Sequence, residues 1–196
     1  MRMESLDPKW IRVSSILAMI PALGADGKWG HPLNDIDPDV LQRKADLGSS
    51  VHAAIAAYCK DEFFVLDKTE EGFMDSFHKW CREVHLAFLS VEQRLYYEPM
   101  SLTGCIDMIG AFGGTDNWQI IDYKCTATPD LKKWALQAAF YFFLCEVNKI
   151  KVDNRVLFVQ LDRIGKMPKV YEFEIKKELI NTAMAMYNAY IYLTRK

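Results

Sequence analysis

One stretch constrains the fold of this chain most strongly: residues 118–126, with the sequence WQIIDYKCT. Side chains alternate between the two faces of a β-strand, so Asp122 and Lys124 point the same way and Tyr123 points the other way. The two isoleucines before Asp122 are apolar, so the charges come where a buried strand leaves the core. Because charged side chains are rarely buried without a partner, this pair either forms a structural ion pair or binds a ligand.

Length and composition indicate one globular domain. The chain has 196 residues, of which 51% are hydrophobic and 26% are charged, enough to bury a sizeable core. No apolar run reaches the roughly 18 residues that a membrane-spanning helix needs. The first ten residues combine acids with no apolar segment, unlike a signal peptide. We therefore expect a single cytoplasmic domain over residues 1–196, with no membrane contact.

Cysteine spacing and net charge exclude several classes of site. The five cysteines are scattered and include no CxxC pair, which is typical of free thiols and disfavours an iron–sulfur cluster or a structural zinc site. The formal net charge is −2, so any contact with DNA must come from a local basic patch. Arg43, Lys44, Lys132 and Lys133 are candidates for phosphate binding, with a solvated surface role as the default for each cluster. Trp29 and Trp134 are candidates for base stacking, although core packing is the favoured role of Trp134.

The periodicity of apolar residues predicts a mixed α/β chain. Strand patterns occupy residues 89–98, 102–112, 118–126, 155–163 and 169–175; helical patterns occupy 38–58 (with a break at Gly48 left open), 67–88 after an Asp67–Glu70 capping box, 130–147, and from 177 onward. The turn GGTDN makes 102–112 and 118–126 an antiparallel pair, so Asp107 and Asp122 become neighbours. We expect an α/β (α+β) fold: a mixed central sheet with antiparallel hairpins, flanked by helices.

Several polar side chains lie where the pattern calls for apolar ones. His52 is at the edge of the apolar face of its helix, one turn after Gly48, and Asp107 stands in an apolar strand. Gln137 and Tyr141 are an i, i+4 pair on a helix that is apolar nearly all round. Each residue, taken alone, has an ordinary explanation as a buried polar group with a hydrogen-bonding partner.

The order of these residues resembles the PD-(D/E)xK nuclease superfamily, and within it the RecB-type exonuclease branch. The resemblance covers about residues 48–141 and consists of a helical histidine after a glycine, Glu92, Gly104-x-x-Asp107, Asp122-Tyr123-Lys124 and Gln137-x-x-x-Tyr141. The proline of the family name is absent, because Ile106 precedes Asp107; this branch commonly has Gly-x-x-Asp instead. The resemblance implies a restriction-endonuclease-like core, here as a stand-alone nuclease module without an iron–sulfur cluster.

The resemblance also implies a metal site. A hard divalent cation, Mg²⁺ or Mn²⁺, would be held mainly by Asp107 and Asp122, with the backbone carbonyl of Tyr123 and the His52 side chain as further ligands. Glu92 would reach the metal through water or bind a second ion. Glu98 lies near enough in sequence to compete with Glu92 for that role.

The remaining family positions carry catalytic roles by the same resemblance. Lys124 would orient the attacking water and neutralise the phosphate. Gln137 and Tyr141 would point towards the site and hold Lys124 or the DNA backbone. The implied function is a metal-dependent DNA exonuclease of phage or bacterial recombination and repair. A recombination or single-strand-annealing partner protein and a homo-oligomer are compatible with it.

Two alternatives stay open at this point. One is an endonuclease or junction resolvase of the same superfamily, which would also cut closed circular DNA. The other is a nucleic-acid-binding module that no longer cleaves, although the complete set of acids and lysine argues against it. The sequence does not distinguish cleavage polarity or a preference for single- or double-stranded DNA.

Overall fold

The computed structural model describes residues 7, 9–20 and 37–194, so Trp29 lies outside the described residues. The elements are, in chain order, β1 (Ile11–Arg12), α1 (Val13–Leu17), α2 (Pro38–Cys59), α3 (Lys68–Val84), β2 (Ala87–Tyr97), the short 3-10 helix η2 (Glu98–Met100), β3 (Leu102–Ala111), β4 (Gln119–Lys124), α4 (Leu131–Val147), β5 (Arg155–Gln160), β6 (Lys169–Glu174) and α5 (Lys177–Thr194). None of these helices combines the length and apolar composition needed to cross a bilayer.

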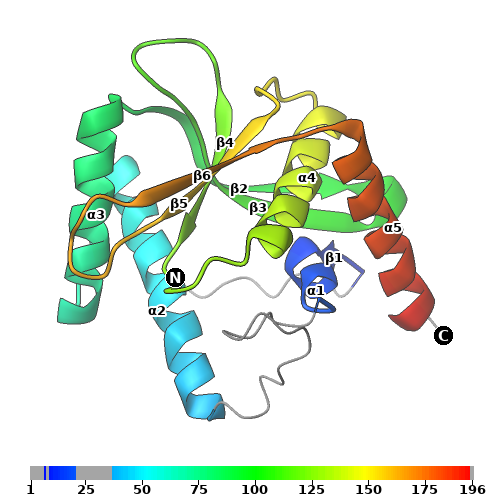
Figure 1. Cartoon of the computed structure of the whole chain (residues 1–196), viewed down its shortest axis with the longest axis horizontal. Coiled ribbons are helices and arrows are strands. Elements are labelled where there is room, and N and C mark those ends of the chain that lie inside the picture. The colour runs from blue at the N-terminus through cyan, green and yellow to red at the C-terminus, as the bar shows by residue number, and fades with distance from the viewer. Residues whose placement is uncertain (1–6, 8, 21–36, 195–196) are drawn as a thin grey trace.

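Six strands form one mixed sheet, which confirms the predicted fold class (Figure 1). The strand order is β1-β3-β4-β5-β6, and β2 pairs with β3. The β3–β4 and β5–β6 pairs are antiparallel hairpins, as the turn sequences predicted. Two parallel pairs, β4–β5 and β1–β3, were not predicted. The β4–β5 pair is the consequence of α4, which carries the chain back between these strands.

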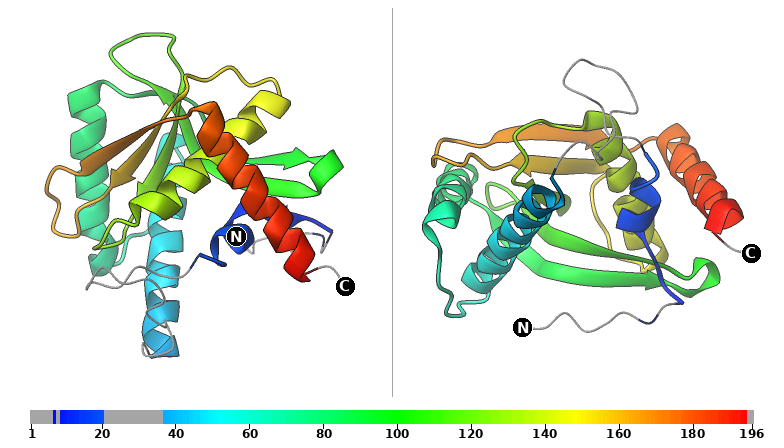
Figure 2. Two further views of the ribbon diagram at one scale, coloured as in Figure 1. Left: turned by 45° about the vertical axis from the view of Figure 1, so that its right-hand side comes forward. Right: turned by 90° about the horizontal axis from the view of Figure 1, so that it is seen from below.

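Helices cover both faces of the sheet, so the core is divided in two (Figures 1 and 2). On one face, α1, α4 and α5 pack over a cluster that includes Ile109 and Ile120. On the other face, α2 and α3 pack over a cluster that includes Met108, Ile121 and Tyr123. Consecutive residues of β3 and β4 therefore contribute to opposite cores, as the alternation of a strand buried on both faces requires.

The structure decides one helix boundary that the sequence left open and differs from expectation at another. The pattern at 38–58 forms one continuous helix, α2, with Gly48 inside it. The capping box of Asp67 and Glu70 starts α3 as predicted, but α3 ends at Val84 rather than near residue 88. The reason is His85, which adopts the left-handed conformation at φ 50 and closes the helix with its N–H on the Cys81 carbonyl.

Candidate active site

In both β2 and β3, the alternation of side chains between the two faces of the sheet is interrupted at one place. In β3, Ile106 packs on the α4 side and Met108 packs on the α3 side, although residues two apart normally share a face. Glu92 of β2 and Asp107 of β3 lie between the registered pairs Val91–Met108 and Gln93–Ile106 and are not a registered pair themselves. Glu92 has φ 49, a left-handed conformation inside a strand. The consequence is that both carboxylates lie on the side of α2.

The β3–β4 ladder ends at the same place. Its last registered pair is Met108 with Ile121, after which β4 continues beside β5 alone. Asp107 fills the opening, because its Oδ2 accepts a hydrogen bond from the Tyr123 N–H at 2.9 Å. Asp122 follows Ile121 on the other strand. The predicted proximity of Asp107 and Asp122 is therefore confirmed, at a point where the two strands separate.

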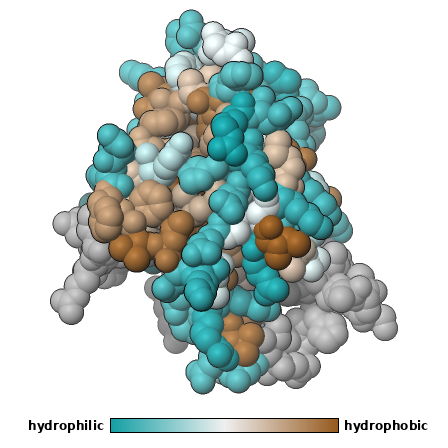
Figure 3. All heavy atoms as spheres, turned by 90° about the vertical axis from the view of Figure 1, so that its left-hand side faces the viewer, coloured by the Kyte–Doolittle hydropathy of each residue, from teal (hydrophilic) through white to brown (hydrophobic). Residues whose placement is uncertain are grey.

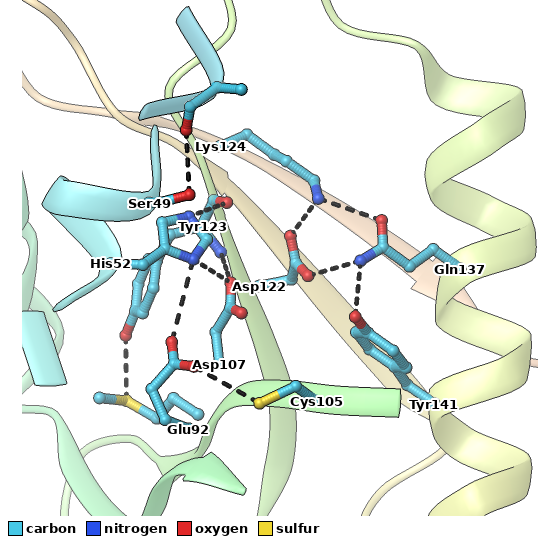
Figure 4. A network of polar contacts seen from close by, with 12 residues as sticks. Ser49, His52, Glu92, Cys105, Asp107, Asp122, Tyr123, Lys124, Gln137 and Tyr141 are labelled. Atoms are coloured by element: carbon cyan, nitrogen blue, oxygen red, sulfur yellow. Dashed lines mark hydrogen bonds and ion pairs between the residues drawn. The ribbon is translucent and has the colours of Figure 1, made fainter. Parts of the chain in front are cut away.

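His52 approaches the opening from α2 (Figure 4). Its Nε2 lies 3.0 Å from the Tyr123 carbonyl, and since a carbonyl only accepts, Nε2 carries the proton. Its Nδ1 lies 3.3 Å from Asp107 Oδ2 and 4.0 Å from Glu92 Oε1. Burial lowers the pKa of His52, but the charge and hydrogen bond of Asp107 outweigh burial and raise that pKa to about 9.

These residues form a group that fits a hard divalent cation. One ligand atom each from His52, Glu92 and Asp107 lie within 4.8 Å of one another. Two carboxylates and one imidazole suit Mg²⁺ or Mn²⁺ better than they suit a soft metal. Without a cation the carboxylates repel each other: burial raises the pKa of Glu92, and the negative charge of Asp107 raises it further. A cation at this position would relieve that repulsion.

Lys124 and Asp122 form a second group on the α4 side of the opening (Figure 4). Lys124 Nζ lies 2.6 Å from Asp122 Oδ2, which is buried and has no well-oriented hydrogen bond. Burial raises the pKa of Asp122 to about 7; the charge of Asp107 raises it too, and Lys124 opposes the rise. Asp122 lies outside the group of three described above, so its role as a metal ligand stays a prediction.

Gln137 of α4 joins the members of this second group. Its Oε1 accepts a hydrogen bond from Lys124 Nζ at 3.0 Å, and its Nε2 donates to Asp122 Oδ1 at 2.9 Å. The second Nε2 hydrogen reaches the Tyr141 hydroxyl at 3.0 Å. All four polar groups of the predicted DxK and Q-x-x-x-Y motifs are thus within one hydrogen-bonded network.

Glu98 does not reach the site. It belongs to η2, beyond the far end of β2, and its exposed carboxylate pairs with Lys9 at 3.6 Å. Of the two glutamates that the sequence left open, the structure brings Glu92 to the candidate metal group. Trp134, for which core packing was favoured over base stacking, is buried and stacks on Phe158 with ring centroids 5.4 Å apart. Trp134 is therefore a core residue.

Sequence reasoning missed two neighbours of the site. Phe158 of β5 places its ring 5.1 Å below the Lys124 ammonium, a cation–π contact that helps to fix the lysine. Cys105 of β3 donates its thiol to Glu92 Oε2 at 3.4 Å. Neither position had a sequence signal, because Phe158 reads as an ordinary core residue and Cys105 only as the middle of a strand.

Comparison with known proteins places this geometry in a family. The family model of the PD-(D/E)XK nuclease superfamily matches residues 64–188, about two thirds of the chain. A comparison with curated protein sequences finds no match.

Two solved structures have a similar fold. An exonuclease candidate from Eubacterium rectale has a TM-score of 0.56 and 11% identity, over 98% of this chain and 85% of that one. The alkaline exonuclease LHK-Exo from Laribacter hongkongensis has a TM-score of 0.51 and 11% identity, over 94% of this chain and 87% of that one. The two solved structures show that the fold agrees with this family match. Because the family model matches more than half of its residues, this chain belongs to the PD-(D/E)XK nuclease superfamily.

Proposed function

We propose that this protein is an Mg²⁺- or Mn²⁺-dependent deoxyribonuclease that degrades DNA from an end. The observation that carries the proposal is the meeting of a His52–Glu92–Asp107 group with the Lys124–Asp122 pair at the opening between β3 and β4. An ion-binding group beside a half-buried ammonium suits a reaction in which negative charge develops on phosphate oxygens. Family membership supports the hydrolytic chemistry.

In this proposal the cation binds between α2 and the two strands. His52, Glu92 and Asp107 form the first set of ligands, and the Tyr123 carbonyl adjoins them through its contact with His52. Asp122 would be a further ligand, with its carboxylate turned from Lys124 towards the cation. The bound cation supplies positive charge and polarises water beside the scissile phosphate, which is the chemistry that phosphodiester hydrolysis requires.

Lys124, together with the Gln137 and Tyr141 side chains that hold it, supplies the functions that the cation does not. Lys124 donates a hydrogen bond to the attacking water or to a phosphate oxygen, and its ammonium compensates the charge of the phosphate. Gln137 fixes the direction of that ammonium by accepting from it while it donates to Asp122. Tyr141 completes the hydrogen bonds of the Gln137 amide, so this side chain keeps one orientation.

Digestion from an end is proposed over internal cleavage on the basis of the similar folds named above, both from proteins described as exonucleases. The second candidate is an endonuclease of the same superfamily. Incubating end-labelled linear DNA and closed circular DNA of equal length with Mg²⁺ or Mn²⁺ separates the two. We expect the linear DNA to be degraded and the circular DNA to persist; equal loss of both would favour the endonuclease.

Substitutions at the Lys124–Asp122 pair test whether this site performs the cleavage. Lys124→Ala removes the ammonium and Asp122→Asn removes the carboxylate charge, so we expect each to lower the cleavage rate by about 10²–10³-fold. Circular dichroism should remain that of the native fold. Lys166→Ala, which alters an exposed lysine in the β5–β6 loop, is the matched control and should cleave normally. Cleavage at the native rate by both site variants would refute the assignment.

A non-cleaving module remains the candidate from another class. It would bind DNA without degrading it under every metal condition, so the same digestion detects it. A role in phage or bacterial recombination, a cytoplasmic location, and assembly with an annealing protein or with further copies of the chain are predictions from the family resemblance.

A further inference from the structure

A cavity lies outside the active site, between the end of α3 and the β5–β6 hairpin. It is a shallow cavity of about 690 Å³ that opens to solvent, and its walls include Trp80, Val84, Phe112, Leu157 and Val170. We call it the α3–β6 cavity. Figure 3 looks onto this side of the molecule, where apolar surface is exposed between hydrophilic side chains. A volume of this size accommodates several amino-acid side chains or a small ligand.

One polar side chain in this cavity has no partner. Gln119, the first residue of β4, is only 6% exposed and lines the cavity. Its amide makes no hydrogen bond or other polar contact within the part of the chain that the structure describes. Its amide oxygen and nitrogen are not among the fully buried polar atoms of the described residues, so they face the cavity and offer one acceptor and two donors to a molecule that enters it. A peptide backbone, with one N–H and one C=O per residue, is a complementary partner.

The charges around the cavity favour a cation. Glu83 and Glu172 lie at its rim and are exposed. The last turn of α3 also lines it, and the C-terminal end of a helix carries partial negative charge. The rim also contains Arg155, whose Nε and Nη2 lie 3.2 and 3.3 Å from the Asp153 carboxylate and whose Nη1 lies 3.9 Å from Glu172 Oε2. This single cation therefore faces Asp153 and Glu172 together, and Glu83 has no such neighbour among the described residues of the rim. The unbalanced charge at the rim is therefore negative.

The adjoining strand can extend such a contact. β6 is the last strand of the sheet, and its outer edge has no strand partner among the described residues. Its cavity-facing side chain Val170 is 45% exposed. An unpaired strand edge next to a cavity is the arrangement in which an extended peptide adds main-chain hydrogen bonds while one side chain enters a pocket.

We propose that the α3–β6 cavity docks a short extended segment of a partner protein, in which a large apolar side chain stands next to lysine or arginine. The apolar side chain fills the cavity, the peptide backbone satisfies Gln119, and the basic side chains lie against Glu83 and Glu172. Nucleic acid is a poorer occupant, because its phosphates would face these same two carboxylates. The proposal goes beyond the nuclease function and does not depend on it.

Peptide titration followed by NMR tests the proposal on the full chain. The probes are acetyl-Lys-Leu-Phe-Lys-amide and its acidic analogue acetyl-Glu-Leu-Phe-Glu-amide, each added up to millimolar concentration. We expect the basic peptide to shift the Gln119 side-chain amide and the Leu157 methyl resonances in a saturable way. The acidic analogue should bind at least about tenfold more weakly, because it places like charges together at the rim.

Matched substitutions locate the binding. Gln119→Leu and Val170→Lys should weaken the basic peptide at least about fivefold, the loss typical of residues that contribute directly to an interface. Glu172→Gln should weaken it as well. The controls are Ile164→Lys and Glu174→Gln. Ile164 is an exposed apolar residue outside the cavity, and Glu174 is the last residue of β6, two positions after Glu172 and not part of the cavity wall. Both controls should bind normally, and all five variants should retain cleavage.

Several results would overturn the proposal. They are the absence of a saturable shift at Gln119 with the basic peptide, equal binding of the acidic analogue, or equal weakening by the control substitutions. A single-stranded oligonucleotide that shifts Gln119 in place of the peptide would assign the cavity to nucleic acid instead. Because the readout is peptide binding, each of these results leaves the nuclease proposal untouched.

Discussion

At Glu92 the backbone holds a conformation that non-glycine residues rarely adopt. Its φ of 49 inside β2 costs on the order of 1–3 kcal/mol relative to an extended residue. Contacts of the Glu92 carboxylate offset this conformational cost, since one of its oxygens faces the Cys105 thiol and the other faces His52. Strain of this kind persists where the surrounding structure fixes it, and it often marks a functional residue. The strained residue here is the one that completes the candidate metal group.

Glu92 and Glu98 can be compared directly. Glu92→Gln removes one charge from the group around His52 and Asp107, so the Mg²⁺ or Mn²⁺ concentration for half-maximal cleavage should rise by about tenfold or more. Glu98→Gln removes only an exposed pair with Lys9 and should leave that concentration unchanged. Metal titration of the cleavage rate measures both. A larger effect at Glu98 than at Glu92 would reverse our choice between the two glutamates.

Gln137 should affect the rate more than the affinity for DNA. Gln137→Leu leaves Lys124 paired with Asp122 but without the amide that directs it, so we expect the single-turnover rate to fall by about 10–100-fold. Tyr141→Phe removes only the hydroxyl that contacts the Gln137 amide and should cost less. Single-turnover kinetics with labelled linear DNA separate rate from binding. An unchanged rate in Gln137→Leu would mean that Lys124 needs no such support.

Residue by residue, the sequence predicted the members of the site better than their arrangement. His52, Asp107, Asp122, Lys124 and Gln137 lie close together, as the order of the family motifs implied. Taken singly, each charged or amide group was visible in an apolar segment but had an ordinary explanation as a buried polar residue. The division into a Glu92-containing metal group and a separate Lys124–Asp122 network was not predicted. It depends on a break in strand alternation that no periodicity reveals, since the residues on either side still read as regular strand.

At the scale of elements, local signals were sufficient for most helices and hairpins. The capping box started α3 and the GGTDN turn set the β3–β4 register, since both are fixed by neighbouring residues. Interactions between segments that are distant in the sequence could not be predicted from these local signals. The parallel pairing of β4 with β5 depends on how α4 packs, and the end of α3 depends on the left-handed His85. These features arise only from the folded chain.

The contact between α3 and the β5–β6 loop gives a stability prediction. A Cβ on Gly72 of α3 would lie 1.9 Å from the Arg163 carbonyl oxygen, so Gly72→Ala must displace the loop. We expect a loss of about 1–3 kcal/mol in the free energy of unfolding. Gly48→Ala in α2 is the matched control: nothing lies within 4 Å of its Cβ, and alanine should add about 0.5–1 kcal/mol. Urea denaturation measures both.

The free energy of unfolding should therefore fall in Gly72→Ala and rise in Gly48→Ala. Gly72 is needed because the loop that begins after β5 lies directly on α3, where the Asp162 N–H also bonds to Ser76 Oγ at 3.0 Å. Gly48 has no such neighbour in the described structure. Equal effects at the two positions would mean that the loop does not pack on α3 in solution.

For the whole molecule, the site lies where the two cores separate. The sheet divides the interior into an α4 side and an α2–α3 side, and the β3–β4 ladder stops between them at Asp107 and Asp122. Helix α2 brings His52 from one side, and α4 brings Gln137 from the other (Figure 4). The two halves of the protein therefore meet through the proposed catalytic residues, and each half contributes one part of the chemistry.

The measurement that tests this arrangement most directly is the anomalous scattering of a crystal soaked in Mn²⁺. We predict an anomalous peak at coordination distance from His52, Glu92 and Asp107, with Asp122 turned towards the ion and away from Lys124. A crystal of Asp107→Asn soaked in the same way should lose the peak. Full occupancy of Mn²⁺ elsewhere in the molecule, with no peak among these side chains, would contradict the central claim.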